Sequence, residues 1–271
     1  VYIEKYGRAP NYVSTSLGYM QYENMIYTFS KVMNFYRTYD RLPNTVSVAT
    51  WSSITGTSTV VTSGGTVNFT DTSDTTTTQI GSDSNGYVLK IGPFGNASST
   101  NKIAVIIGVH FQEGAAHLAM LNALKTLSSQ LNNVQIWVYK VVITTDLDDY
   151  TLSREHGQDL ASAFVVPDID SSYKLVVDTH GNRGLYATND FVFAPYEDSN
   201  SVNYANEIVG TTDYLKYFYV SGSSPDYVTI PIAKKGIASV VFELYLNVDK
   251  YNIVLYNKCL EVVEGLNTIF A

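Results

Sequence analysis

Two of the chain's four histidines lie beside a carboxylate in the stretch VHFQEGAAH, residues 109–117. His110 and Glu113 are three residues apart and follow the apolar run IAVIIG, and His180 follows a second apolar run, LVVD. Two imidazoles and one carboxylate around an open fourth position form the ligand set of a catalytic zinc site. The sequence therefore predicts that His110, Glu113 and His180 bind Zn²⁺, which would polarise a carbonyl and acidify a water.

A carboxylate in an apolar segment is the candidate general base. Glu243 lies in SVVFELYL, a run of strand-forming residues. Burying a carboxylate is costly unless it faces a cation, a hydrogen-bond donor or a reacting water. We predict that Glu243 removes the proton of the attacking water. The alternative is an ion pair with Lys234 or Lys235.

Each of these residues also has a structural interpretation. His110 and Glu113 are alternatively a hydrogen-bonded pair at a strand end, and His180 a turn cap beside Asp178. His117, four residues after Glu113, is an alternative third ligand, although Gly114 favours a turn over a helical site.

A sheet must bring these separated side chains together. Runs of β-branched and aromatic residues of strand length recur at 87–92, 102–109, 134–143, 173–178 and 238–246. Helical spacing of apolar residues follows the second run, over 118–131, and returns over 253–266. Near-continuous apolar strands separated by helices predict an α/β fold, with a mixed, mostly parallel twisted sheet flanked by helices. Ligands bind such sheets at the carboxyl ends of the strands.

The first part of the chain has a different character. YGRAPNYVS from Tyr6 and YDRLPNTVS from Tyr39 share one frame, and the apolar spacing between them predicts an amphipathic helix. A Ser/Thr-rich stretch follows, in which 66–69 is a possible short strand. We therefore predict three parts, namely a helical repeat segment over 1–50, a linker or irregular segment over 51–85, and a catalytic domain over 86–271.

Composition limits the possible partners and location. The formal net charge is −8 and no basic run exists, which argues against a nucleic-acid partner. No segment is apolar for 18 residues, so no membrane span is expected. The single Cys259 excludes an internal disulfide. Polarity from Ser, Thr, Asn and Tyr is common in secreted and surface proteins, and a chain that opens at Val1 is expected to be part of a longer protein.

Four pieces, in order, resemble the zinc carboxypeptidases known as funnelins. VHFQE resembles their His-x-x-Glu, and VVDTHG their strand ending in a third ligand. SGSSPD resembles their Ser-Gly-Gly-Ser-x-Asp loop, and VVFELYL is similar to the strand that holds their general base. The resemblance covers residues 86–260 and implies a carboxypeptidase-like zinc peptidase domain.

The resemblance also implies roles for residues outside the ligand set. Arg154 matches an arginine that stabilises the oxyanion, and Tyr219 or Tyr217 matches a tyrosine that covers the substrate. Ser221 and Asp226, the ends of SGSSPD, fall in the substrate loop.

The chain departs from the family pattern at the carboxylate clamp. Ala161 and Ser162 stand where the family has an Asn-Arg pair, so the clamp is lost or supplied elsewhere. Arg183, three residues after His180, is a candidate to reach a substrate carboxylate. The short interval from Glu113 to His180 implies smaller loops and a more open cleft.

The N-terminal repeats resemble the pseudomurein-binding repeat of archaeal cell-wall proteins. With the catalytic domain, this implies an extracellular, wall-associated zinc peptidase that hydrolyses amide or isopeptide bonds in pseudomurein peptides. The alternatives are a catalytically inactive wall-binding or adhesin domain of the same fold, and an amidohydrolase of small acylated amino acids.

Overall fold

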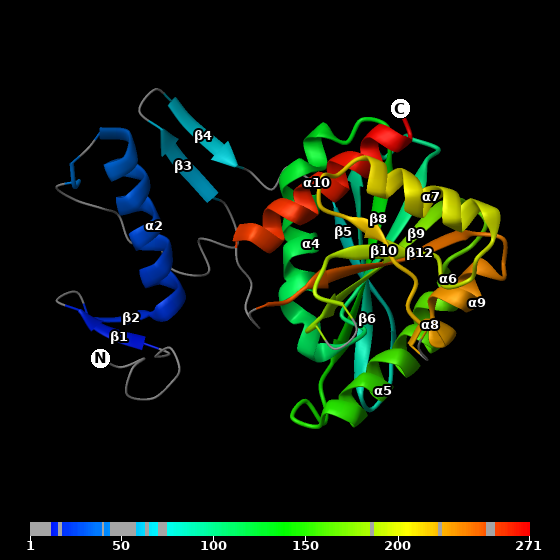
Figure 1. The fold of residues 1–271 in the computed structure, drawn as a ribbon. Coiled ribbons are helices and arrows are strands. Elements are labelled where there is room, and N and C mark those ends of the chain that lie inside the picture. The colour runs from blue at the N-terminus through cyan, green and yellow to red at the C-terminus, as the bar shows by residue number, and fades with distance from the viewer. Residues whose placement is uncertain are drawn as a thin grey trace. The chain divides into compact units, whose positions relative to one another are not determined.

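The computed structural model describes residues 12–15, 18–39, 41–43, 58–62, 65–69, 75–184, 187–221, 224–247 and 253–271. The chain forms two compact units, Val1–Thr72 and Ser73–Ala271 (Figure 1). The predicted boundaries near residues 50 and 85 stay predictions.

The described residues of the first unit form one helix and two small hairpins. β1 (Tyr12–Thr15) pairs antiparallel with β2 (Gly18–Gln21), and β3 (Ser58–Thr62) pairs antiparallel with β4 (Gly65–Phe69). α2 (Tyr22–Tyr39) confirms the predicted helix between the two repeats. Four of its apolar side chains are exposed and recur at helical spacing: Ile26, Phe29, Met33 and Tyr36. Most of both repeat motifs, including residues 6–11 and 44–47, lies outside the described residues.

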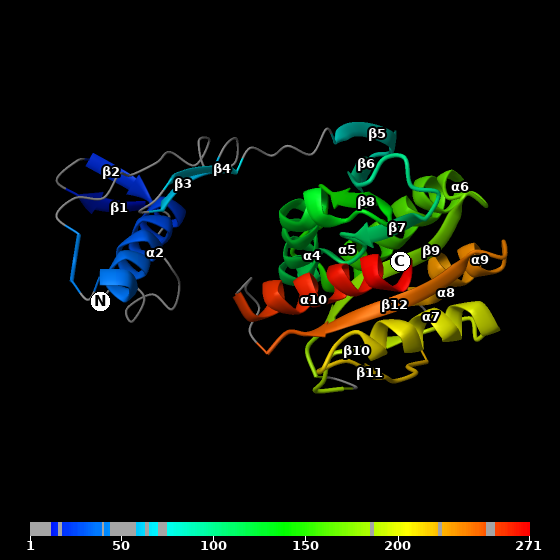
Figure 2. The ribbon, with the colours of Figure 1, turned by 90° about the horizontal axis from the view of Figure 1, so that it is seen from above.

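The second unit is built on an eight-stranded sheet. Figure 2 shows the strands stacked in the order β11-β10-β12-β9-β7-β8-β6-β5. Their bounds are β5 (Thr76–Ser82), β6 (Gly86–Gly95), β7 (Lys102–Ile107), β8 (Gln135–Ile143), β9 (Tyr173–Asn182), β10 (Phe191–Phe193), β11 (Lys216–Tyr217) and β12 (Ala238–Tyr245). Four neighbour pairs are parallel and three are antiparallel. The predicted mixed, mostly parallel α/β sheet is confirmed.

Helices cover both faces of this sheet. Their bounds are α4 (Gly114–Leu127), α5 (Tyr150–Leu160), α6 (Val166–Asp168), α7 (Ser199–Gly210), α8 (Ser224–Tyr227), α9 (Thr229–Ala233) and α10 (Ile253–Ile269). Shorter helical turns are η1 (Phe111–Glu113), η2 (Ser128–Gln130) and η3 (Ala161–Val165). In Figure 1, α4 and α10 lie on one side of the sheet and α5, α8 and α9 on the other.

Strand alternation creates two separate cores. Ile103, Val105 and Ile107 of β7 pack with α4, α7 and α10, whereas Ala104 and Ile106 pack with α5, η3 and α9. Successive side chains of a strand point to opposite faces, so a strand buried on both sides reads as continuously apolar. This explains why the central strands were recognisable in the sequence.

Three elements differ from the predictions, each for a local reason. β7 ends at Ile107 because Gly108 adopts φ +89°, a left-handed conformation that breaks the strand. β9 continues to Asn182, so His180 lies within the strand, not after it. Residues 76–82, placed in the linker, form β5, because their backbone pairs with β6 at the edge of the sheet.

Candidate metal centre

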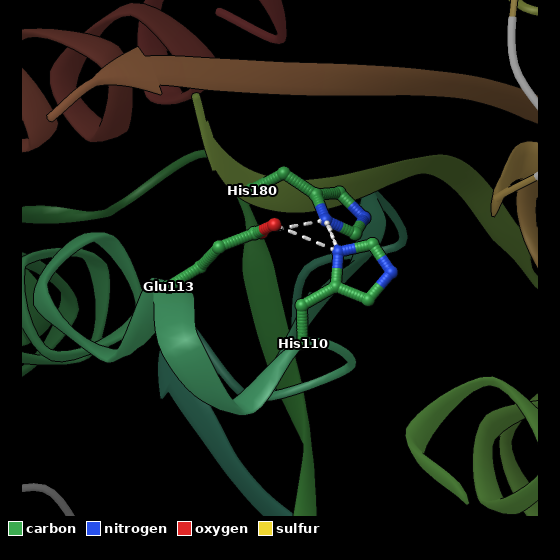
Figure 3. Close-up of side chains that lie close together, drawn as sticks. All are labelled: His110, Glu113 and His180. Atoms are coloured by element: carbon green, nitrogen blue, oxygen red, sulfur yellow. Dashed lines mark hydrogen bonds and ion pairs between the residues drawn. The ribbon is translucent and has the colours of Figure 1, made fainter. Parts of the chain in front are cut away.

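His110, Glu113 and His180 meet in one buried cluster (Figure 3). Nδ1 of His110 lies 2.9 Å from Oε1 of Glu113, and Nδ1 of His180 lies 3.0 Å from Oε2. The two Nδ1 atoms are 3.1 Å apart. The residues are 2%, 8% and 4% exposed, so the cluster is almost fully shielded from water.

The backbone after β7 places the first two residues. Gly108 turns the chain out of the strand, and a Cβ there would lie 2.1 Å from the carbonyl oxygen of Val141. His110 follows in an extended conformation and precedes η1. The amide of Glu113 donates to the carbonyl of His110 at 3.0 Å, which closes the turn and brings both side chains to one point.

The donor atoms fit a metal ion. Tetrahedral Zn²⁺ with nitrogen and oxygen ligands at about 2.1 Å separates its donor atoms by roughly 3.4 Å. One ligand atom from each of the three residues lies within 4.8 Å of the others, and the two Nδ1 atoms, 3.1 Å apart, need only a small expansion to reach that value. The residue types and their spacing therefore suit a bound metal ion.

Contacts from outside the cluster orient two of its members. Arg154 Nη1 donates to Glu113 Oε1 at 3.0 Å, and the amide of Gly181 donates to Oε2 at 3.0 Å. His180 Nε2 pairs with Oδ1 of Asp178 at 3.1 Å. A proton on Nε2 of His180 is thereby favoured, and metal binding through Nδ1 would displace the proton that Nδ1 directs at Glu113.

Burial and charge move the pKa values of all three residues. Burial lowers the pKa of His110, and the attraction of Glu113 offsets this only in part. Burial acts to raise the pKa of Glu113, but His110 and His180 outweigh it and hold that pKa well below its usual range. Burial acts to lower the pKa of His180, but Asp178 and Glu113 outweigh it and raise that pKa well above its usual range. Glu113 is therefore ionised at neutral pH, as a metal ligand must be.

Glu243 is held at the same place by the neighbouring strand. It is the register partner of His180 in the parallel pair β12 and β9. Paired residues of adjacent strands point to the same face of a sheet, so both side chains face the same side. Glu243 is buried, and it lines a cavity of about 280 Å³ together with the three cluster residues.

The cavity brings together most of the predicted site residues. Its lining includes His110, Gln112, Glu113, Tyr150, Arg154, His180, Gly181, Asn182, Arg183, Phe193, Val220, Ser221, Ser224, Pro225, Val241 and Glu243. Arg154 and Arg183 place two positive charges in this wall, whereas Phe193, Val220 and Val241 give it an apolar part.

Three predicted substrate residues lie beside this lining. Among the described residues, the lining does not include Tyr217, Tyr219 or Asp226. Tyr219 is 46% exposed and packs edge-on against Phe193, with ring centroids 5.7 Å apart. Tyr217 is half-buried in β11, and Asp226 is exposed in α8.

The other two histidines and the positions that replace the family's Asn-Arg pair lie outside the lining of this cavity. His117 is buried in α4, and burial lowers its pKa to about 4, so it is neutral at pH 7. His156 pairs with Asp146 at 2.9 Å. Ala161, the first residue of η3, is buried in the core, and neither it nor Ser162 lines this cavity, so the segment that would carry the Asn-Arg pair lies away from it.

Sequence reasoning assigned no role in the site to four residues that surround the cluster. Asp178 is two residues before His180 on one strand, and this spacing places both on the same face, so the sequence held a usable signal. Gln112 lies in η1 between the two ligands of that turn and donates to Ser153 Oγ at 2.7 Å. Gln158 and Ser224 contact His110 from distant parts of the chain; Ser224 lies within the SGSSPD motif, but nothing in that motif indicates a contact with His110, and no local pattern marks Gln158.

Comparisons with known proteins place the chain only loosely. No model of a known family and no curated protein matches it. Among solved structures, a metallo-carboxypeptidase from Burkholderia cenocepacia is 10% identical, with a TM-score of 0.45 over 72% of this chain and 64% of that one. The product-bound cell shape determinant protein from Helicobacter pylori is 10% identical, with a TM-score of 0.45 over 68% and 54%.

A third similar structure is a succinylglutamate desuccinylase/aspartoacylase from Rhodobacter sphaeroides. It is 13% identical, with a TM-score of 0.45 over 79% of this chain and 63% of that one. The chain thus spans less than two thirds of the length of these three proteins.

In the part of the chain that the structure describes, no helix has the length and apolar character needed to cross a membrane.

Proposed function

We propose that this chain is a zinc-dependent hydrolase of amide bonds, of the carboxypeptidase-like type. The observation that carries the proposal is the buried His110–Glu113–His180 cluster with Glu243 in register beside His180, all lining one cavity. Two histidines and a carboxylate leave a coordination position open, which is the arrangement of catalytic rather than structural zinc.

The roles of the protein's own groups follow from their positions. Zn²⁺ bound by His110, Glu113 and His180 would polarise the substrate carbonyl and lower the pKa of a water. Glu243 accepts a proton from the attacking water and delivers it to the departing amine, acting first as base and then as acid. Its carboxylate is suited to this work because it is buried beside the cluster and opens onto the cavity.

Arg154 is the candidate oxyanion stabiliser. Its guanidinium lines the cavity and donates one hydrogen bond to Glu113, at 3.0 Å, so the Glu113 carboxylate orients it. A fixed positive charge beside the developing oxyanion lowers the barrier without any reorganisation during the reaction.

The substrate contacts are assigned to the cavity wall and its rim. Arg183 donates to the carbonyl of Gln112 at 3.0 Å, which holds it at the cavity, where it is proposed to bind a substrate carboxylate. Ser221 lines the same cavity. Tyr219, packed on Phe193, is proposed to close over the substrate, with Tyr217 and Asp226 supporting this rim.

The finer substrate assignment is the peptide stems of pseudomurein, cut at amide or isopeptide bonds, by a protein located outside the cell. The support for this assignment is the resemblance of the two N-terminal motifs to wall-binding repeats. Whether the enzyme trims an end or cuts a cross-link depends on whether Arg183 acts as the carboxylate clamp.

The cavity volume favours a second candidate, an amidohydrolase of small acylated amino acids. Ligand pockets usually enclose about 300–1,000 Å³, and about 280 Å³ lies just below that range. Two arginines in the wall suit a small substrate with more than one anionic group. Release of amine from an acyl amino acid, but not from a wall peptide, would select this candidate.

The decisive experiment measures metal content and hydrolysis together. The purified chain should contain about one zinc per molecule by plasma mass spectrometry, and His110→Ala should contain none. Hydrolysis of pseudomurein peptides should stop after chelation and return when zinc is added. If the wild-type chain binds no zinc after incubation with the metal, the proposal is wrong.

A further inference from the structure

Two polar side chains that lie far from His110 in sequence contact its Nε2, the ring nitrogen that does not face Glu113 and His180. Its Nδ1 faces Glu113 and His180, whereas its Nε2 lies 3.1 Å from Ser224 Oγ and 3.2 Å from Gln158 Nε2. Gln158 is buried in α5, and Ser224 is the first residue of α8. His110 therefore has polar contacts on both ring nitrogens, from opposite sides.

The chemistry of a metal ligand tells which of these contacts is useful. A neutral imidazole that binds a metal through Nδ1 carries its proton on Nε2, and this proton needs an acceptor. A serine hydroxyl can accept it. The Gln158 amide nitrogen only donates, so as oriented it opposes this tautomer, and its oxygen faces His110 only after a half-turn of the amide. Ser224 is thus the partner that accepts the proton without rearrangement.

The two histidines are supported in different ways. Asp178 lies on the same strand as His180, so that contact is set by β9 alone. Ser224 is separated from His110 by 114 residues and belongs to the segment that forms one wall of the cavity, with Ser221 and Pro225. The orientation of His110 therefore depends on where this wall lies.

We infer that Ser224 is a positioning residue that holds His110 in the tautomer and orientation needed to bind the metal through Nδ1. This inference rests on the metal site of the proposed function. It assigns to the cavity wall a role in metal affinity, in addition to any contact with substrate. Loss of such an outer contact typically weakens metal binding by about 10- to 100-fold.

The test is a competition titration of zinc against a chromogenic chelator. Ser224→Ala should bind zinc at least about 10-fold more weakly than the wild type, and Ser224→Thr, which keeps the hydroxyl, should bind nearly as well. Ser221→Ala is the matched control on the same wall of the cavity, and its zinc affinity should equal that of the wild type. Gln158→Glu, which replaces a donor by an acceptor, should bind zinc more tightly. Thermal unfolding of the metal-free proteins should be the same for Ser224→Ala and the wild type.

The outcomes separate the inference from the proposed function. If the wild type binds zinc and Ser224→Ala binds it equally well, the inference is wrong and the proposed function stands. An equal loss in Ser221→Ala would also overturn the inference, because the effect would then belong to the wall in general. A wild type that binds no zinc contradicts the proposed function itself. If Ser224→Ala does not fold, the zinc affinity of Gln158→Glu decides. An affinity of that variant equal to or weaker than that of the wild type overturns the inference.

Discussion

Glu243 and His180 are register partners on adjacent parallel strands, and both side chains face the same cavity. The candidate base and one candidate metal ligand therefore belong to one rigid sheet, and their spacing is set by backbone hydrogen bonds between β12 and β9. Groups held on strands keep their geometry better than groups on loops, which is what a proton transfer in the transition state requires.

Glu243→Gln should abolish turnover and leave the metal in place. The amide has nearly the shape of the carboxylate but cannot take a proton from water, and general-base catalysis is worth about 10²–10⁴-fold. We would measure the rate of amide hydrolysis and the zinc content on the same preparation. Glu264→Gln, on the exposed side of α10, is the control and should behave as wild type. A Glu243→Gln protein with normal turnover would remove Glu243 from the mechanism.

Arg154→Met should lower kcat and leave KM nearly unchanged when zinc is saturating. The substitution keeps much of the side chain's length but removes the charge beside Glu113. Removal of one donor to an oxyanion costs about 10²–10³-fold in kcat. Steady-state kinetics separate the two parameters. If KM rises and kcat is unchanged, Arg154 binds the ground state of the substrate and does not stabilise the oxyanion.

Gly108→Ala should destabilise the domain and impair zinc binding. Alanine disfavours the φ of +89°, and its Cβ would collide with the carbonyl oxygen of Val141 at 2.1 Å. A loss of more than about 1 kcal/mol is expected where a side chain is incompatible with the native backbone. Urea unfolding of the metal-free proteins measures it.

Gly114→Ala is the matched control for that experiment. Gly114 has an ordinary helical conformation, and nothing lies within 4 Å of a Cβ there. Alanine should stabilise the start of α4 by up to about 1 kcal/mol, because it loses less backbone entropy than glycine. If both variants lose stability equally, the special conformation of Gly108 is not the cause.

The ion pair between Lys90 and Asp168 should make stability depend on pH in acid. Burial acts to raise the pKa of Asp168, but hydrogen bonds from Lys90 at 2.5 Å and Tyr139 at 2.6 Å outweigh it and lower that pKa. A carboxyl whose folded pKa is below its unfolded value of about 3.9 stabilises the fold above that pH. The contribution is lost as pH falls through the folded pKa.

Asp168→Asn tests this dependence because asparagine has the same shape without the charge. Urea unfolding should show that the variant has a lower free energy of unfolding than the wild type at pH 7. The difference should be the same at pH 5. The difference should shrink at pH 3 and below. If the difference in free energy of unfolding stays constant down to pH 3, the hydrogen bonds of Asp168 stabilise the fold and its charge does not.

The central strands and the candidate site residues on or after them were predictable for one shared reason. β7, β9 and β12 are buried on both faces, so each reads as a continuous apolar run, and a polar residue at its carboxyl end stands out. His110, His180 and Glu243 were found in this way. Parallel neighbours then bring the ends of such strands together.

Other parts of the site and fold carry no such pattern. β5 reads TTTQIGS, a polar run that becomes a strand only because β6 offers it backbone partners. Ser224 and Gln158 reach His110 through tertiary packing, which one sequence does not show. Tyr217 and Tyr219 were assigned from a resemblance, and neither is among the residues that line the cavity.

The insertion of β12 between β9 and β10 has a consequence for biosynthesis. The chain reaches both candidate histidine ligands by residue 180, but β12 begins only at Ala238, and Glu243 comes 63 residues after His180. A nascent chain that ends before residue 238 leaves the edges of β9 and β10 without the strand that separates them, and open edges invite aggregation. The same strand joins β10 and β11 to the rest of the sheet and carries the proposed base, so the proposed hydrolytic activity is expected to appear only after β12 has been made.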